Sequence, residues 1–170
     1  MRFVQMLETF VVTVFRLLVG LAFLTLIVAV LMQVMGRLSG ASPVWTEELS
    51  RFALLYLAAI GAGLALRTGD LVNVDIVCEA LPSRVSWWLR LISAMLVAAL
   101  GLYLLPMAWR YTTIGNLQTS PALGLQMSFV HVTMFLMLVL LAFFALLRVI
   151  GMITGTTDGR PAAFDIPQED

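Results

Sequence analysis

Four long runs of uncharged, mainly apolar residues are the feature that most restricts what this chain can fold into. About 20 such residues in a helix cross the hydrocarbon core of a membrane. Hydrophobic residues make up 61% of the whole chain, against roughly half of a soluble domain. We therefore predict an all-α integral membrane protein with four transmembrane helices. They should cover about residues 17–36, 50–68, 88–109 and 127–147 of a single membrane domain, 1–153.

The second run is short, because only the 15 residues 52–66 are uncharged between Arg51 and Arg67. At about 1.5 Å per residue this run covers roughly 22 Å, less than the roughly 30 Å of the hydrocarbon core. We expect the helix to continue into the flanking turns, with both arginine side chains reaching out to the membrane surface.

Two amphipathic segments are predicted beside the spans. Residues 1–16 carry apolar side chains at helical spacing and predict an N-terminal helix, which either lies on the membrane surface or simply extends the first span. Residues 71–84 gather their apolar side chains on one helical face and include Pro82, which predicts a short interfacial helix between spans two and three. Residues 154–170 are expected to form a disordered cytoplasmic tail.

The arginines predict the orientation, because cytoplasmic loops of membrane proteins carry an excess of basic residues. All ten basic residues of the chain are arginine. Seven lie on the side of the membrane that holds both termini, and three lie on the other side. Both termini are therefore expected in the cytoplasm, with the connections 37–50 and 110–126 on the opposite side.

Charged residues cluster at the start of the second span. Glu47 and Glu48 precede Arg51 by four and three positions, so the arginine could pair with either carboxylate on one helix face. Such a pair is either an exposed ion pair worth less than about 1 kcal/mol or an anchor that orients a partner protein. The spacing alone favours neither interpretation.

The interiors of two spans carry residues that alter helix packing. Pro106 lacks an amide donor and should kink the third helix or end it there. Span two has pairs of small residues four positions apart, which allow another helix to approach closely, either in this chain or in a partner. These pairs are Ala58/Ala62, Ala59/Gly63 and Gly61/Ala65.

The chemistry of an enzyme is not visible in this sequence. No Asp, Glu or Arg lies inside the four uncharged runs, which are residues 17–36, 52–66, 91–109 and 127–147, and His131 and Cys78 are the only histidine and cysteine. One histidine cannot provide two axial haem ligands, and no nucleophile–base pair, phosphate loop or metal-binding cluster can be assembled. We expect no catalytic residue, cofactor or metal, no binding of nucleic acid, and contact with membrane lipids.

An ordered set of residues around span two resembles the small membrane subunit, DctQ type, of tripartite ATP-independent periplasmic (TRAP) transporters. The pattern is Trp-x-x-Glu-Leu-x-Arg, a short helix of small residues, Arg-x-Gly-x-x-(Val/Ile)-x-Val-Asp and then Leu-Pro-x-Arg. The four-helix plan with both termini inside is similar as well. Asp70 departs from the family pattern, which often has His there. The matching positions are Trp45, Glu48, Leu49, Arg51, Arg67, Gly69, Val72, Val74, Asp75, Leu81, Pro82 and Arg84.

The resemblance implies a multi-pass protein of the bacterial inner membrane that pairs with a large, elevator-type permease subunit. A periplasmic substrate-binding protein would deliver an organic acid, and uptake would be coupled to an ion, typically sodium. The small subunit would widen the fixed scaffold, and its outer loops would help to dock the binding protein. The residues expected to anchor the subunit or contact a partner are Trp45, Glu47, Glu48, Arg51, Gly61, Gly63, Arg67, Gly69, Asp70, Asp75 and Arg84.

Two other functions fit the same residues. The chain could be an accessory membrane subunit of another complex, such as a respiratory enzyme. It could also be a self-sufficient small carrier, although carriers of charged solutes usually place ionisable groups at mid-membrane.

Overall fold

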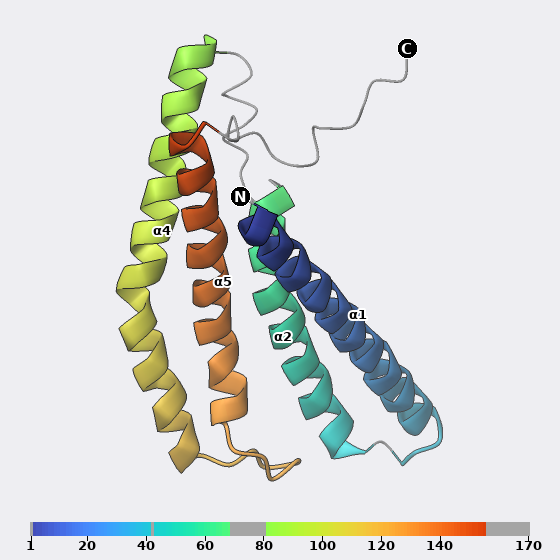
Figure 1. Cartoon of the computed structure of the whole chain (residues 1–170). Coiled ribbons are helices and arrows are strands. Elements are labelled where there is room, and N and C mark those ends of the chain that lie inside the picture. Colours follow the sequence, from blue (N-terminus) through green and yellow to red (C-terminus); the bar gives the residue numbers. More distant parts are fainter. Residues whose placement is uncertain (1, 42, 69–80, 156–170) are drawn as a thin grey trace, which may run out of the picture. The chain divides into compact units, whose positions relative to one another are not determined.

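The computed structural model describes residues 2–41, 43–68 and 81–155, with residues 2–9 and 68 described by their backbone alone. Four long helices account for most of this part of the chain (Figure 1). They are α1 (Arg2–Leu38), α2 (Val44–Thr68), α4 (Ser83–Ile114) and α5 (Ser128–Ile153), and a short 3₁₀ helix, η1 (Gly115–Leu117), follows α4.

All four helices are long and apolar enough to cross a membrane, which confirms the predicted fold class. Helix α2 has 25 residues, or roughly 37 Å at 1.5 Å per residue. The short apolar run therefore does extend into its flanking turns, as expected.

The segments predicted beside the spans have different outcomes. Helix α1 is continuous from Arg2 to Leu38, so the backbone of residues 2–16 leads directly into the first span. The position of this segment on a membrane surface stays a prediction. Most of the expected interfacial helix 71–84 and of the tail 154–170 lies outside the described residues, and α4 begins at Ser83, directly after Pro82.

Pro106 does not end the third span. Helix α4 continues from this proline to Ile114, so the structure excludes one of the two predicted alternatives, the end of the helix, and the kink stays a prediction. The missing amide costs one helical hydrogen bond. Ending the helix within an apolar environment would expose several backbone groups without water to satisfy them. Continuing the helix therefore costs less free energy than ending it at Pro106.

The chain divides into two compact units, and the division cuts through α2, α4 and α5. The first unit contains α1, α2 as far as Gly61, α4 from Met107 and α5 as far as Leu136. The second contains the remaining parts of α2, α4 and α5.

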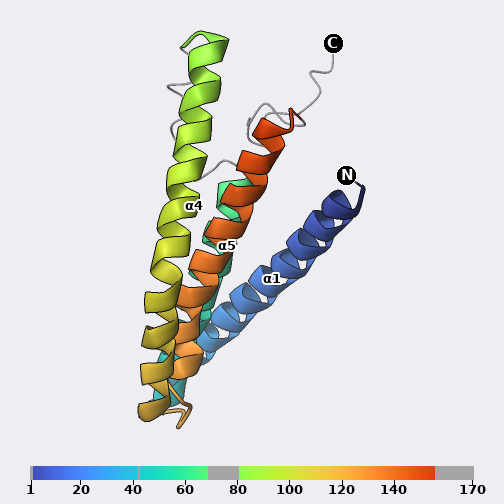
Figure 2. The same cartoon turned by 60° about the vertical axis from the view of Figure 1, so that its left-hand side comes forward.

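Helix packing in the second unit depends on two glycines. A Cβ atom on Gly63 of α2 would lie 2.6 Å from Cβ of Leu140, and one on Gly101 of α4 would lie 3.1 Å from Cβ of Ala142. Both neighbours belong to α5, and α4 and α5 run side by side in both views (Figures 1 and 2). Close backbone approach at small residues is the usual way in which membrane helices pack.

Helix α1 in the first unit is mostly uncovered. Only 6% of its most apolar window is buried, and the buried side chains that the structure describes include Val12 and Ala29. Many of its exposed residues are large and apolar, among them Leu17, Leu21, Leu24 and Met35. Such a helix suits contact with lipid or with another membrane protein.

Candidate partner interface

The polar contacts of the first unit gather where α2 begins and where α4 leads into α5. Helix α2 starts directly after Pro43, whose carbonyl oxygen accepts a 2.7 Å hydrogen bond from the hydroxyl of Thr46. The Thr46 side chain is completely buried. This contact sets the first turn of α2 and so determines the directions of the charged residues that follow.

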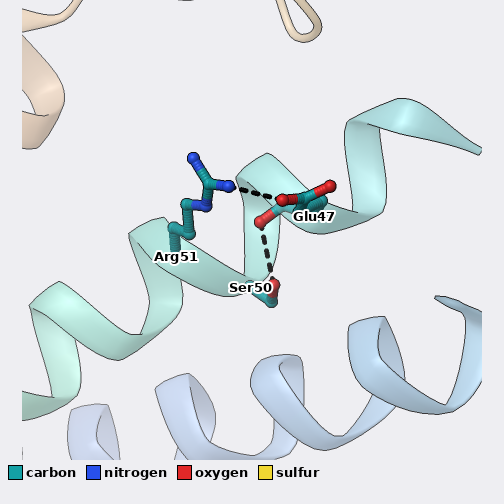
Figure 3. A network of polar contacts seen from close by, with 3 residues as sticks. All are labelled: Glu47, Ser50 and Arg51. Carbon is teal, nitrogen blue, oxygen red and sulfur yellow. Dashed lines mark hydrogen bonds and ion pairs between the residues drawn. The ribbon is translucent and has the colours of Figure 1, made fainter.

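Glu47 and Arg51 form an ion pair along the surface of α2 (Figure 3). The hydroxyl of Ser50 donates a 2.9 Å hydrogen bond to the carbonyl oxygen of Glu47 in the same turn. Both charged side chains are exposed, Arg51 by 71% and Glu47 by 51%. Of the two pairings that the spacing allowed, the structure has the one with Glu47.

Glu48 points to a different partner, the loop between α4 and α5. One carboxylate oxygen, Oε2, accepts hydrogen bonds from the backbone N–H groups of Ala122 and Leu123, each at 3.0 Å. The Leu123 amide also donates a 3.2 Å hydrogen bond to the hydroxyl oxygen of Ser120. Hydrogen bonds to an ionised acceptor are about twice as strong as neutral ones. Glu48 therefore joins the start of α2 to a loop more than 70 positions away.

The loop is folded so that these N–H groups face one way. Thr119 and Gln126 form an antiparallel bridge, and the Ser120 amide donates a 2.7 Å hydrogen bond to the Leu125 carbonyl. Gly124 closes the turn with φ +66°, a conformation that other residues rarely adopt. Successive amides in such a turn form a concave site for an anionic oxygen, and Glu48 occupies it.

Tyr56 makes a second attachment between α2 and the start of α5. Its hydroxyl donates a 2.6 Å hydrogen bond to the carbonyl oxygen of Phe129. Glu48, Phe52 and Tyr56 are spaced by four and therefore lie on one face of α2. This face holds both the loop and the first turn of α5.

His131 closes the corner between α4 and α5. Its ring stacks on the ring of Tyr111 at 4.0 Å between centroids, and its Nδ1 atom lies 3.1 Å from the Tyr111 carbonyl oxygen. Gly115 packs against the same place, because an added Cβ would lie 2.7 Å from Nδ1 and 2.5 Å from the Ser128 amide nitrogen. The buried imidazole thus supports the corner through the last turn of α4.

The structure separates the residues that the sequence singled out. Trp45, Glu47, Glu48, Arg51 and Gly61 belong to the first unit, whereas Gly63, Arg67 and Arg84 belong to the second. Gly69, Asp70 and Asp75 lie outside the described residues.

The two glycines of α2 have different surroundings. Gly63 packs on α5, whereas among the described residues no atom beyond the local backbone of α2 lies within 4 Å of a Cβ placed on Gly61. No group of three His, Cys, Asp or Glu side chains that could hold a metal ion occurs among the residues whose placement is described.

Several contact residues were not singled out from the sequence. Ala122 and Leu123 bind the carboxylate of Glu48, Ser120 accepts a hydrogen bond from Leu123, and Tyr56 binds Phe129. The Ser-Pro-x-x-Gly sequence 120–124 is a turn signal that could have indicated a folded loop. Nothing in the sequence pairs that turn with Glu48.

A comparison with known protein families shows to which family this chain belongs. The model of the family described as "Tripartite ATP-independent periplasmic transporters, DctQ component" matches residues 26–155, most of the chain. The chain belongs to the DctQ family. The resemblance found in the sequence is confirmed, and the protein is a component of a transporter.

A curated relative supports this assignment. The "Isethionate TRAP transporter permease protein DctMQ" of Oleidesulfovibrio alaskensis is 33% identical over 92 residues. The aligned part is 50% of this chain but only 14% of the relative. This DctQ chain therefore corresponds to a small part of that longer permease protein.

Proposed function

We propose that this DctQ protein is the small permease subunit of a TRAP transporter and forms part of the fixed scaffold for a large permease subunit. The observation that carries the proposal is the exposed apolar surface of α1, of whose most apolar window only 6% is buried. The apolar runs of the four helices contain no charged residue. A subunit with these properties supports a transport site on another chain and does not contain one itself.

Helix α2 offers a second face to the large permease. Leu54 and Ala58 are exposed, and Gly61 has open space where a side chain would be. These positions are three or four apart and share one helix face. A partner helix could approach this face as closely as α5 approaches Gly63.

The loops at the starts of α2 and α5 would help to dock a periplasmic substrate-binding protein. The excess of arginine on the side of both termini, seven against three, supports an orientation with these loops outside the bacterial inner membrane and both termini in the cytoplasm. The solute would be an organic acid, and its uptake would be coupled to an ion, typically sodium. The name of the DctMQ relative specifies isethionate, an organic anion.

The test is purification of the full chain from its native membrane in mild detergent, followed by mass spectrometry of bound proteins. We expect a large hydrophobic permease at equal stoichiometry. Recovery of the chain alone, or with redox subunits, would refute the proposal.

The Gly61→Leu variant tests the α2 face. Apart from the local backbone of α2, no atom of the described residues is within 4 Å of the new Cβ, so the subunit should fold and insert, yet it should lose the large permease. Leu54→Met changes the same face without blocking close approach and is the matched control. Normal recovery of the permease with Gly61→Leu would exclude this face.

A further inference from the structure

We infer that Glu48 is a positioning residue that holds the loop 118–127 in the shape in which it meets the periplasmic binding protein. The inference rests on the proposed function, which assigns docking to this side of the subunit. It adds the residue that makes the docking surface rigid. Two donors of one turn, the Ala122 and Leu123 amides, converge on the Glu48 carboxylate, and the Ser120 hydroxyl oxygen accepts a 3.2 Å hydrogen bond from the same Leu123 amide.

The loop has few other constraints of its own. Its backbone ladder consists of the Thr119–Gln126 bridge and the hydrogen bonds beside it. An isolated two-stranded turn is marginally stable in water. The Glu48 contacts fix the tip of this turn against a long helix, and the Tyr56 hydroxyl fixes the first turn of α5 on the same helix face. Loop and helix therefore hold one arrangement.

Glu48 suits this site in both its length and its charge. A single oxygen of Glu48 serves both amides, and buried Ser120 accepts a 3.2 Å hydrogen bond from the Leu123 amide beside it. Glutamine keeps an acceptor oxygen but loses the charge, so it should preserve part of the effect. Alanine leaves the turn amides without this acceptor.

The held loop presents an uncharged surface. Leu117, which is 88% exposed, precedes it, and Pro121 and Leu125 are exposed within it. A partner binds a preformed loop more tightly, because no binding free energy is spent on ordering the loop. Loss of the Glu48 contacts should therefore weaken docking and leave the transport step itself unchanged.

The experiment compares Glu48→Ala, Glu48→Gln and Ser120→Ala with Glu47→Ala as the matched control, since Glu47 is adjacent but pairs with Arg51. Each full-length subunit is co-expressed with its large permease and reconstituted in liposomes. Hydrogen exchange of the peptide containing Ala122 and Leu123 is the first measurement. We expect at least about tenfold faster exchange with Glu48→Ala, less with Glu48→Gln, and no change with Glu47→Ala.

The second measurement is uptake as a function of the concentration of binding protein. Glu48→Ala should raise the half-saturating concentration about fivefold to tenfold while the maximal rate stays within twofold, because only the ordering cost of docking changes. Unchanged exchange, or an unchanged half-saturating concentration, would overturn the inference.

The two proposals fail in different ways. If the wild-type complex shows no uptake that depends on a binding protein, the proposed function is wrong whatever the exchange data show. If wild-type uptake has this dependence and Glu48→Ala changes only the maximal rate, the proposed function stands and the positioning role of Glu48 is refuted. Ser120→Ala removes a side chain of the loop itself, so a defect shared with Glu48→Ala would locate the effect in the loop and not in the folding of α2.

Discussion

Gly63 of α2 lies so close to Leu140 of α5 that a Cβ atom on it would be 2.6 Å from the Cβ of that leucine. Two positions earlier, a Cβ on Gly61 would meet no atom within 4 Å in the part of the chain that the structure describes, the local backbone of α2 left aside. The two glycines of one small-residue helix thus have separate roles, one in packing within the chain and one on an open face.

Replacing these glycines by alanine should therefore have opposite effects. Gly63→Ala forces α2 and α5 apart and should lower the stability of the subunit by about 1–3 kcal/mol. Gly61→Ala removes a helix-interior glycine without a clash and should be neutral or stabilise by up to about 1 kcal/mol. Thermal unfolding in detergent, followed by circular dichroism, checks both. Equal midpoints for the two variants would contradict the packing.

The Tyr56→Phe variant should lose the hydrogen bond to the Phe129 carbonyl and little else. Hydrogen bonds between membrane helices contribute about 0.6 kcal/mol on average, so a decrease in stability of roughly 0.5–1.5 kcal/mol is expected. Tyr103→Phe is the control, because that tyrosine is 68% exposed. The same unfolding measurement applies, and a loss of equal size in both variants would show that the Tyr56 contact contributes nothing of its own.

Gly115→Ala should disturb the corner between α4 and α5. The new methyl group would lie 2.5 Å from the backbone nitrogen of Ser128, and backbone cannot move aside as a flexible side chain can. We expect a loss of about 2 kcal/mol or more and a change in the near-ultraviolet spectrum of the stacked Tyr111. Gly20→Ala, where no described atom beyond the local helix backbone lies within 4 Å of the added atom, is the control and should be neutral or slightly stabilising. An unchanged spectrum and stability for Gly115→Ala would show that this corner is looser than the structure indicates.

Arg51→Ala separates the two interpretations of the charged cluster. As an exposed ion pair with Glu47, Arg51 should contribute less than about 1 kcal/mol to the stability of the isolated subunit. If it also anchors a partner, the variant should reduce co-purification of the large permease, and Arg51→Lys should restore it only in part, because lysine lacks the planar fork of donors. Normal assembly with Arg51→Ala would exclude the anchoring interpretation.

The helices could be predicted because the membrane leaves few alternatives. Each apolar run must satisfy its backbone hydrogen bonds internally, and a helix does so whatever its neighbours are. The same argument explains why α2 extends past Arg51 and Arg67 and why α4 continues through Pro106. For Pro106, the sequence predicts either a kink or the end of the helix, and it does not choose between these two outcomes.

The candidate interface was less accessible to prediction. The spacing put Arg51 within reach of both Glu47 and Glu48, but it could not choose a partner for each carboxylate. The loop that binds Glu48 is 74 and 75 positions away in the chain, and its donors are backbone amides, which every non-proline residue carries. The Tyr56 contact could not be predicted for the same reason, because its acceptor is the backbone carbonyl oxygen of Phe129, a group that every residue carries.

By itself, the sequence determined the number of helices, their places in the chain and membership of the DctQ family, because these follow from apolar length and from local residue patterns. Only the tertiary structure decided that Arg51 pairs with Glu47, that Glu48 holds the loop, and that Gly63 but not Gly61 meets another helix of this chain. The physical reason is that neighbouring residues on one helix have nearly the same local energetics. What distinguishes them is the segment that the fold brings opposite each one.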